Sequence, residues 1–307
     1  MNKLALCLPG GGACGRWQAG VMQYLCDINV LQSVDIVCGT SVGGLNGLLF
    51  AKDPLHFSEN VKLWEKIKSN KDVYLGMLQF NNFFDILGMV GQLFKTNKGK
   101  SLLDPAPLYR LIDKTFGDMQ IKDLKLPVRI TATNLNVGER IVIDSETCSD
   151  YKVSEVAKAT SAIPIVFPAV DYWREGEKEL CVDGGLGRNN PVEIGIESGA
   201  THIILIGTSP DIYPPKKVKN NVLDIAVRTQ DIIMRTFEEE AWEEKEYREK
   251  LHMIAPEKFP EIKILDIYPE TSTGSALDFC NVASFYAGYK FAAENFPQEI
   301  FDAFQND

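Results

Sequence analysis

The chain has 307 residues, of which 45% are apolar and 24% charged, and its formal net charge is −10. This length suits one large domain or two small ones, and the composition excludes an intrinsically disordered protein. The excess of Asp and Glu over Lys and Arg, 42 against 32, argues against binding to nucleic acid and against capture by a membrane through overall charge alone.

The first predicted strand covers residues 4–8 and is followed by a glycine-rich loop. This loop contains Gly10, Gly11 and Gly12, and apolar residues then recur at helical spacing from residue 18 to residue 26. The loop therefore lies between a strand and the N-terminus of a helix. Unpaired backbone N–H groups at such a place bind anions.

The second predicted strand, residues 34–38, leads into the sequence Gly-Thr-Ser-Val-Gly at residues 39–43. A helix up to residue 50 follows. This G-x-S-x-G pattern at a strand-to-helix turn exposes the hydroxyl of Ser41 and directs a helix N-terminus towards it. Gly39 and Gly43 are the small residues that such a tight turn requires. By itself the pattern also fits an ordinary glycine-rich turn. The two strands with a helix between them predict a parallel sheet.

Residues 52–115 are predicted to form a helical cap. Helices are expected over residues 59–68 and 104–115. Between them, residues 72–94 are rich in Phe, Met and Leu, but polar residues such as Asp85 argue against a transmembrane helix. The segment either covers the core as ordinary helices or forms a cap that contacts lipid.

Strands and helices continue through the rest of the chain. The patterns predict strands at residues 127–134, 140–144, 170–173, 180–182, 202–207 and 262–267, and helices at 153–161, 191–199, 222–251 and 283–295. No repeat or linker interrupts them. We therefore expect one α/β domain over residues 1–307, with a mostly parallel central sheet flanked by helices. Residues 211–307 would complete it.

A serine nucleophile needs a group that accepts its proton, and the chain has 3 histidines, at positions 56, 202 and 252. None lies in a glycine-flanked turn, although His252 is late enough in the chain for a Ser-Asp-His triad. Asp183 is the better candidate, because it ends a predicted strand and precedes Gly184 and Gly185. Active sites in parallel sheets form at the carboxyl ends of strands, so Ser41 and Asp183 are expected to share one edge.

In this order, the glycine loop, the Ser41 turn and the Asp183 turn resemble the patatin-like phospholipase family. The likeness covers residues 4–206, including stretches at residues 131–135, 161–168 and 183–191. The resemblance implies a three-layer α/β sandwich and a Ser-Asp dyad that needs no histidine, metal or other cofactor. Ser41 would be the nucleophile, Asp183 the base, and the backbone amides of residues 10–12 the oxyanion hole.

The glycine loop departs from the family pattern at one position. The family usually has G-G-G-x-R/K-G, and this chain has Cys14 in place of the basic residue. Arg16 follows two residues later. Either Arg16 replaces the missing charge, or the oxyanion site lacks its usual positive neighbour. The backbone donors are unaffected, so activity is expected to survive.

The expected function is a phospholipase A-type lipid acyl hydrolase that touches membranes peripherally and acts through an acyl-enzyme. A catalytically silent lipid-binding protein on the same fold is a second class. A dinucleotide-binding protein is a third, because Gly10, Gly12 and Gly15 also fit G-x-G-x-x-G with Asp35 downstream. However, Asp35 begins its predicted strand, whereas the ribose-binding acid belongs at a strand's carboxyl end.

The cysteines predict a reduced, cytoplasmic protein. There are 7, an odd number, scattered through apolar strands and helices without the spacing of a zinc site. The apolar run before Pro9 is too short for the core of a signal peptide.

Overall fold

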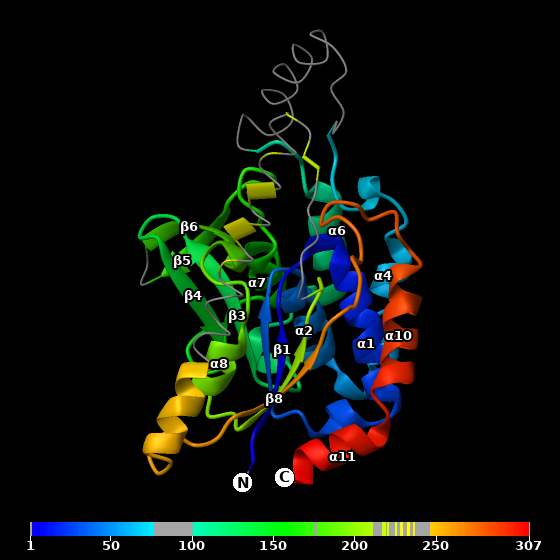
Figure 1. The fold of residues 1–307 in the computed structure, drawn as a ribbon. Helices are drawn as coiled ribbons and strands as arrows, with labels where there is room; N and C mark the ends of the chain where they lie inside the picture. The colour runs from blue at the N-terminus through cyan, green and yellow to red at the C-terminus, as the bar shows by residue number, and fades with distance from the viewer. Residues whose placement is uncertain are drawn as a thin grey trace.

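The structure is a computed structural model that describes residues 2–76, 101–174, 177–210 and 246–306, with scattered positions between 217 and 236. In these residues one 8-stranded sheet has the order β5-β6-β3-β2-β1-β7-β8, with β4 paired to β3 off this path (Figure 1). The strands are β1 (Leu4–Leu8), β2 (Ile36–Thr40), β3 (Val128–Asn134), β4 (Glu139–Asp144), β5 (Val170–Arg174), β6 (Glu177–Asp183), β7 (His202–Ile206) and β8 (Lys263–Ile267). From β3 to β8 along this order the neighbouring strands are parallel, whereas β4, β5 and β6 pair antiparallel.

Helices cover both faces of the sheet (Figure 1). The described helices are α1 (Gly15–Asp27), α2 (Val42–Lys52), α3 (Phe57–Asn60), α4 (Leu63–Lys66), α6 (Ala106–Phe116), α7 (Val153–Thr160), α8 (Val192–Glu197), α10 (Ser284–Asn295) and α11 (Gln298–Asn306). Every residue of β1 is buried, as expected for a parallel strand covered on both sides. Its alternating leucines, such as Leu6, join the large core with α1 and α2, while Ala5 and Cys7 pack with residues of α8. The chain therefore has the predicted α/β fold.

Two glycines allow α1 and α10 to cross at very short distance. A Cβ at Gly20 would lie 2.0 Å from the carbonyl oxygen of Phe285, and a Cβ at Gly288 would lie 2.1 Å from that of Trp17. Any larger residue at either position would push the helices apart. This contact fixes α10 alongside α1, on the side of the sheet that carries α4 (Figure 1).

Most predicted elements are present, with two differences. The helix expected over residues 59–68 consists of two short helices, α3 and α4, and α11 was not predicted. The apolar residues of the proposed cap, 77–94, and most of the helix predicted over residues 222–251 lie outside the described residues. Within the described part of the chain, no helix has both the length and the apolar character needed to cross a membrane.

Candidate active site

Ser41 occupies a strained turn between β2 and α2. Its backbone angles are φ 54° and ψ −129°, a conformation that residues other than glycine rarely adopt. Its N–H donates to Oγ1 of Thr160 at 2.8 Å. A Cβ at Gly39 would lie 2.7 Å from Cα of Gly44, and one at Gly43 would lie 2.0 Å from the carbonyl oxygen of Leu8. Neighbouring backbone thus requires both glycines of the motif and holds the serine in place.

The register of three strands brings Asp183 to this turn. β2 runs parallel to β3 as far as the pair Thr40–Thr131, and β6 runs antiparallel until Asp183 pairs with Ala132. Since β4 occupies the other edge of β3, β2 and β6 must meet end to end along the same edge. Ser41 directly follows Thr40, and therefore lies next to Asp183. The two residues were expected to meet because parallel strands end at the same edge of a sheet. This reason was wrong for Asp183, because β6 runs antiparallel to β3.

Asp183 is a fully buried carboxylate. Its Oδ1 accepts the N–H of Gly185 at 2.8 Å, and its buried Oδ2 has no hydrogen-bond partner among the described residues. Burial raises the pKa of Asp183 from 3.8 to about 7, and the nearby Ser41 hydroxyl and the Gly185 amide oppose that rise. A carboxyl that titrates near neutral pH, with a free oxygen beside a serine, suits proton transfer.

The glycine loop packs directly against the serine. A Cβ at Gly10 would lie 2.7 Å from Cβ of Ser41. The N–H of Gly10 donates to Oδ1 of Asn189 at 3.0 Å, and its carbonyl accepts the hydroxyl of Thr208 at 2.7 Å. The amide of Gly10, which was expected among the oxyanion donors, therefore already has an acceptor in Asn189. In the part of the chain that the structure describes, the amides of residues 11 and 12 have no such partner.

Asn189 and Thr208 were not predicted as site residues. Asn189 belongs to the Asn-Asn-Pro sequence after the Asp183 turn, a stretch that resembles the family but does not by itself indicate a role in the site. Thr208 follows β7 without any motif around it. Their contacts with Gly10 span 179 and 198 residues, so local sequence carries no signal of them beyond their place at strand ends.

Arg16 does not stand in for the missing basic residue of the loop. Its guanidinium donates through Nη2 to the carbonyls of Trp64, at 3.3 Å, and Ile67, and lies 5.4 Å from the centre of the Trp64 ring. Cys14, at the position usually basic, has its Sγ 3.7 Å from the carbonyl oxygen of Gly274. Arg16 therefore supports the wall formed by α4.

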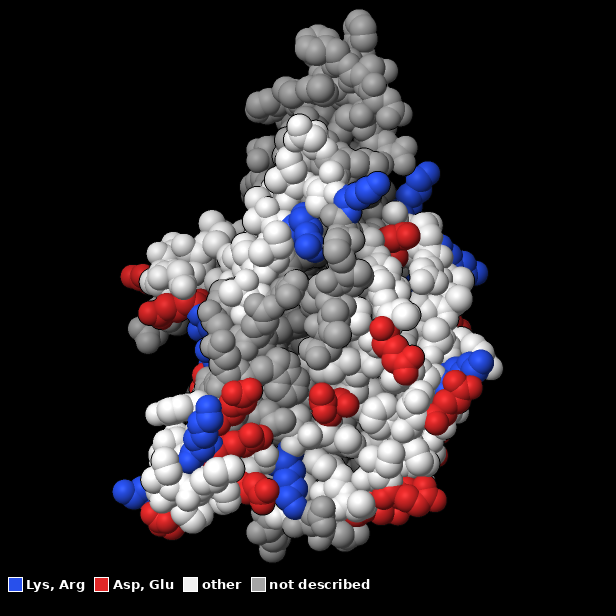
Figure 2. All heavy atoms as spheres, in the orientation of Figure 1, with Lys and Arg blue, Asp and Glu red and all other residues white. Residues whose placement is uncertain are grey.

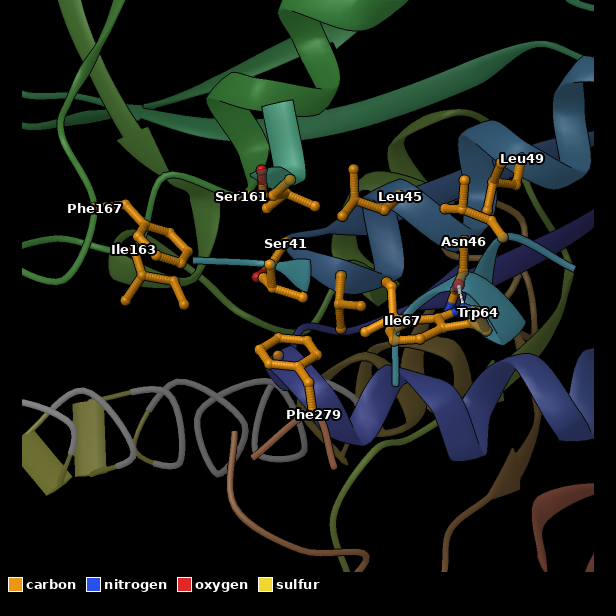
Figure 3. A pocket seen from close by; sticks show the side chains of 15 residues that line it. Ser41, Leu45, Asn46, Leu49, Trp64, Ile67, Ser161, Ile163, Phe167 and Phe279 are labelled. Carbon is orange, nitrogen blue, oxygen red and sulfur yellow. Dashed lines mark hydrogen bonds between the residues drawn. The ribbon is translucent and has the colours of Figure 1, made fainter. Parts of the chain in front are cut away.

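An apolar slot opens at Ser41. Its volume is about 50 Å³, and aliphatic and aromatic side chains from α2, α4, α6 and the loops around them form most of its wall. Figure 3 labels Ser41, Leu45, Asn46, Leu49, Trp64, Ile67, Ser161, Ile163, Phe167 and Phe279 around it. In Figure 3, Ser41 lies between Ile163 and Phe167 on one side and the side chains of α2 and α4, such as Leu45 and Trp64, on the other. Gly12 also lines the slot, so the loop and the serine face one space.

The three histidines, all in described segments, lie away from this slot. His56 is exposed and contacts Asp53, and Nδ1 of His252 is 2.7 Å from the carbonyl oxygen of Phe259. His202 begins β7, where it packs against Phe304. None of the three lines the slot.

The position of Asp35 excludes the dinucleotide-binding alternative. Asp35 precedes β2 and accepts the N–H of Leu4 through Oδ2 at 2.7 Å, so it lies where β1 and β2 begin. The glycine loop follows the opposite end of β1. An acid that held a ribose would have to lie near the loop, so the dinucleotide-binding alternative was wrong.

A serine on a strained strand-to-helix turn, in an α/β fold, defines a protein of the hydrolase type. The family model described as "Patatin-like phospholipase" matches residues 6–196. The chain therefore belongs to the patatin-like phospholipase family, a family of lipid acyl hydrolases, as its motifs predicted.

Similar proteins come from several kingdoms. The chain is 27% identical over 208 residues to patatin-like phospholipase domain-containing protein 7 of Mus musculus. This alignment covers 67% of this chain and 13% of the mouse protein. It is 30% identical over 140 residues to lysophospholipase nte1 of Aspergillus terreus, 44% of this chain and 8% of that protein. The structure of VipD from Legionella pneumophila aligns with a TM-score of 0.48 and 13% identity, over 99% of this chain and 67% of VipD. The chain thus spans a small part of the curated relatives.

Proposed function

We propose that this chain hydrolyses carboxylic esters of phospholipids or other acyl lipids, with Ser41 as nucleophile and Asp183 as base. The observation that carries the proposal is the buried, unpaired Oδ2 of Asp183 beside the Ser41 turn. A carboxyl whose pKa is raised to about 7 is partly ionised at neutral pH and can both accept and return a proton. The family assignment supports the same chemistry.

The proposed reaction has two halves. Asp183 takes the proton of the Ser41 hydroxyl while Oγ attacks the ester carbonyl carbon, and the amides of Gly11 and Gly12 stabilise the resulting oxyanion. The carbon–oxygen bond to the alcohol then breaks, and Asp183 returns the proton to the departing alcohol oxygen. Asp183 next deprotonates a water molecule, which attacks the acyl carbon. The bond between this carbon and Oγ of Ser41 then breaks, the fatty acid leaves, and Asp183 returns the proton to Oγ. The N-terminus of α2 adds a favourable dipole at the serine.

The shape of the slot supports an acyl chain as the bound part of the substrate. Its wall is almost entirely hydrocarbon, and it is narrow, so a flexible alkyl chain fits where a polar head group would lose its hydration. The head group would therefore remain outside, towards the solvent.

Peripheral contact with a lipid surface is proposed next to the slot. Leu75 and Ile165 are 45% and 62% exposed, and each is two residues from a residue that lines the slot. Ile165 also has φ 69°, which β-branched residues rarely adopt. On the face shown in Figure 2, the described Lys and Arg side chains are scattered among Asp and Glu and form no broad basic patch. Apolar contact must therefore supply the adsorption.

Labelling and mutation of Ser41 test the proposal. A fluorophosphonate is expected to modify Ser41. The Ser41→Ala variant should hydrolyse phosphatidylcholine in vesicles and a short soluble ester at least about 10³-fold more slowly than the wild type. His252→Gln is the matched control and should keep its activity, because that ring is bonded elsewhere. An inactive but folded His252→Gln would favour a triad. If the wild-type protein binds lipid but neither reacts with the fluorophosphonate nor hydrolyses either ester, it is the catalytically silent lipid-binding protein.

A further inference from the structure

A second and larger pocket lies on the other side of Trp64. Its volume is about 590 Å³, and residues of α1, α3 and α4 and the segment leading into α10 line it. Figure 1 shows α1 and α10 side by side, with α4 near their upper ends. Trp64 lines this pocket as well as the slot at Ser41, so one indole ring separates the two. The proposed hydrolysis does not use this second pocket.

A buried cation faces the pocket, and the described part of the chain provides no counterion for it. The Arg16 side chain lines it although the residue is only 2% exposed. Its guanidinium donates to the carbonyls of Trp64 and Ile67, and no carboxylate among the described residues forms an ion pair with it. An unpaired buried charge is costly, and an anion in the pocket would remove that cost.

The rest of the lining combines further positive charge with apolar surface. Lys62 and Lys68 line the pocket together with one carboxylate, Glu65, and all three are on its exposed side. Opposite them, the segment before α10 and its first turn present apolar groups, of which Val282 is 55% and Tyr286 71% exposed. Cations beside uncovered apolar surface fit a ligand with an anionic end and a hydrocarbon end.

We propose that this pocket binds an amphiphile that carries an anionic head group on an alkyl chain. The head group lies against Arg16, with Lys62 and Lys68 at the rim, and the chain covers Val282 and Tyr286. A fatty-acid carboxylate and an alkyl phosphate share this chemistry. The site does not depend on hydrolysis, because none of these residues touches Ser41 or Asp183.

Cys280 supplies a direct readout. It lines the pocket and is exposed, whereas the other six cysteines, all in described segments, are buried or half-buried. In Ser41→Ala protein, which removes turnover from the measurement, the rate at which a maleimide modifies Cys280 is followed by mass spectrometry. Oleate, dodecyl phosphate and the uncharged monooleoylglycerol are compared below their aggregation concentrations. We expect one or both anions to slow the reaction at least 10-fold, and the uncharged lipid to leave it unchanged.

Charge reversal at the rim locates the binding. Lys62→Glu with Lys68→Glu should raise the concentration of anion needed for half protection by 10-fold or more. Lys66→Glu is the matched control, since Lys66 is exposed and lies between the two lysines in the sequence but does not line the pocket, and it should have little effect. Arg16 is left intact because it also holds two carbonyls of α4 and the residues after it. Equal protection by the uncharged lipid, no protection by either anion, or equal effects of the two sets of variants would overturn the proposal.

Discussion

Asp183→Asn keeps the shape of the side chain and removes its charge. The wild-type carboxyl has no exposed surface, and burial raises its pKa from 3.8 to about 7. The shift is roughly 3 pKa units, and each unit corresponds to about 1.4 kcal/mol, so ionisation of Asp183 lowers the free energy of unfolding by about 4 kcal/mol. Asparagine carries no such charge, and its oxygen can still accept the N–H of Gly185.

The sign of the pH dependence follows from proton binding. Between about pH 4 and pH 7 the folded protein retains a proton on Asp183 that the unfolded chain releases. The stability of the wild type should therefore fall as the pH rises through this window, relative to that of Asp183→Asn. The advantage of the variant should be about 4 kcal/mol larger at pH 8 than at pH 4. All other titrating groups cancel in this comparison.

Urea unfolding of the two proteins at pH 4, 6 and 8 measures the difference. The same variant should lose at least about 10³-fold in kcat/KM, while the kcat/KM of the wild type should rise with pH around an apparent pKa of about 7. A stability difference that stays constant from pH 4 to pH 8 would show that Asp183 ionises normally in the folded protein. That result would refute both the raised pKa and the argument that burial prepares this carboxyl as a base.

Two further changes test the loop and the exposed isoleucine. Gly11→Ala should lower kcat more than it raises KM, because the new Cβ would lie 2.2 Å from Oγ1 of Thr208 and move an oxyanion donor. Thr208→Ala should recover part of that loss, because it removes Oγ1 and leaves Cβ of Thr208, 2.6 Å from the new Cβ, as the remaining close contact. No recovery in the double variant would contradict this cause. Ile165→Gly should raise the free energy of unfolding by about 1 kcal/mol by relieving backbone strain, and urea unfolding measures it. It should also lower hydrolysis of vesicles but not of a short soluble ester, and equal losses on both substrates would remove Ile165 from lipid contact.

The positions of Ser41 and Asp183 could be predicted because each is marked by local sequence. An apolar run shows where the strand ends, and glycines after it show that another part of the backbone comes close. The direction of β6 has no such mark. β6 pairs with β3 although about 50 residues separate Ala132 from Asp183, and this contact between distant segments leaves no local signal. The meeting of the Ser41 and Asp183 turns was therefore predicted partly for the wrong reason.

The role of Arg16 shows a second limit of sequence patterns. In a helix, a residue two positions further along lies about 200° around the axis, so a charge moved by two positions points to nearly the opposite side. Arg16 accordingly meets the carbonyls of Trp64 and Ile67, and its link to the site is through that wall. Spacing predicted that it would lie on a different side of the helix, but not what it would contact there.

A chain of buried hydrogen bonds connects the apolar slot at Ser41 to the glycine loop. Nε1 of Trp64 donates to Oδ1 of Asn46 at 2.9 Å, and Nδ2 of Asn46 donates to Oε1 of Gln18 and to the carbonyl of Gly15. Nε2 of Gln18 in turn donates to the carbonyl of Pro9 at 3.3 Å. Asn46 and Gln18 have no exposed surface, so each lost bond would leave a buried polar group unsatisfied. One polar network therefore fixes both the wall of the apolar slot and the residues on both sides of the glycine loop. Under the proposed function, this network would make the position of the acyl chain and that of the oxyanion donors interdependent.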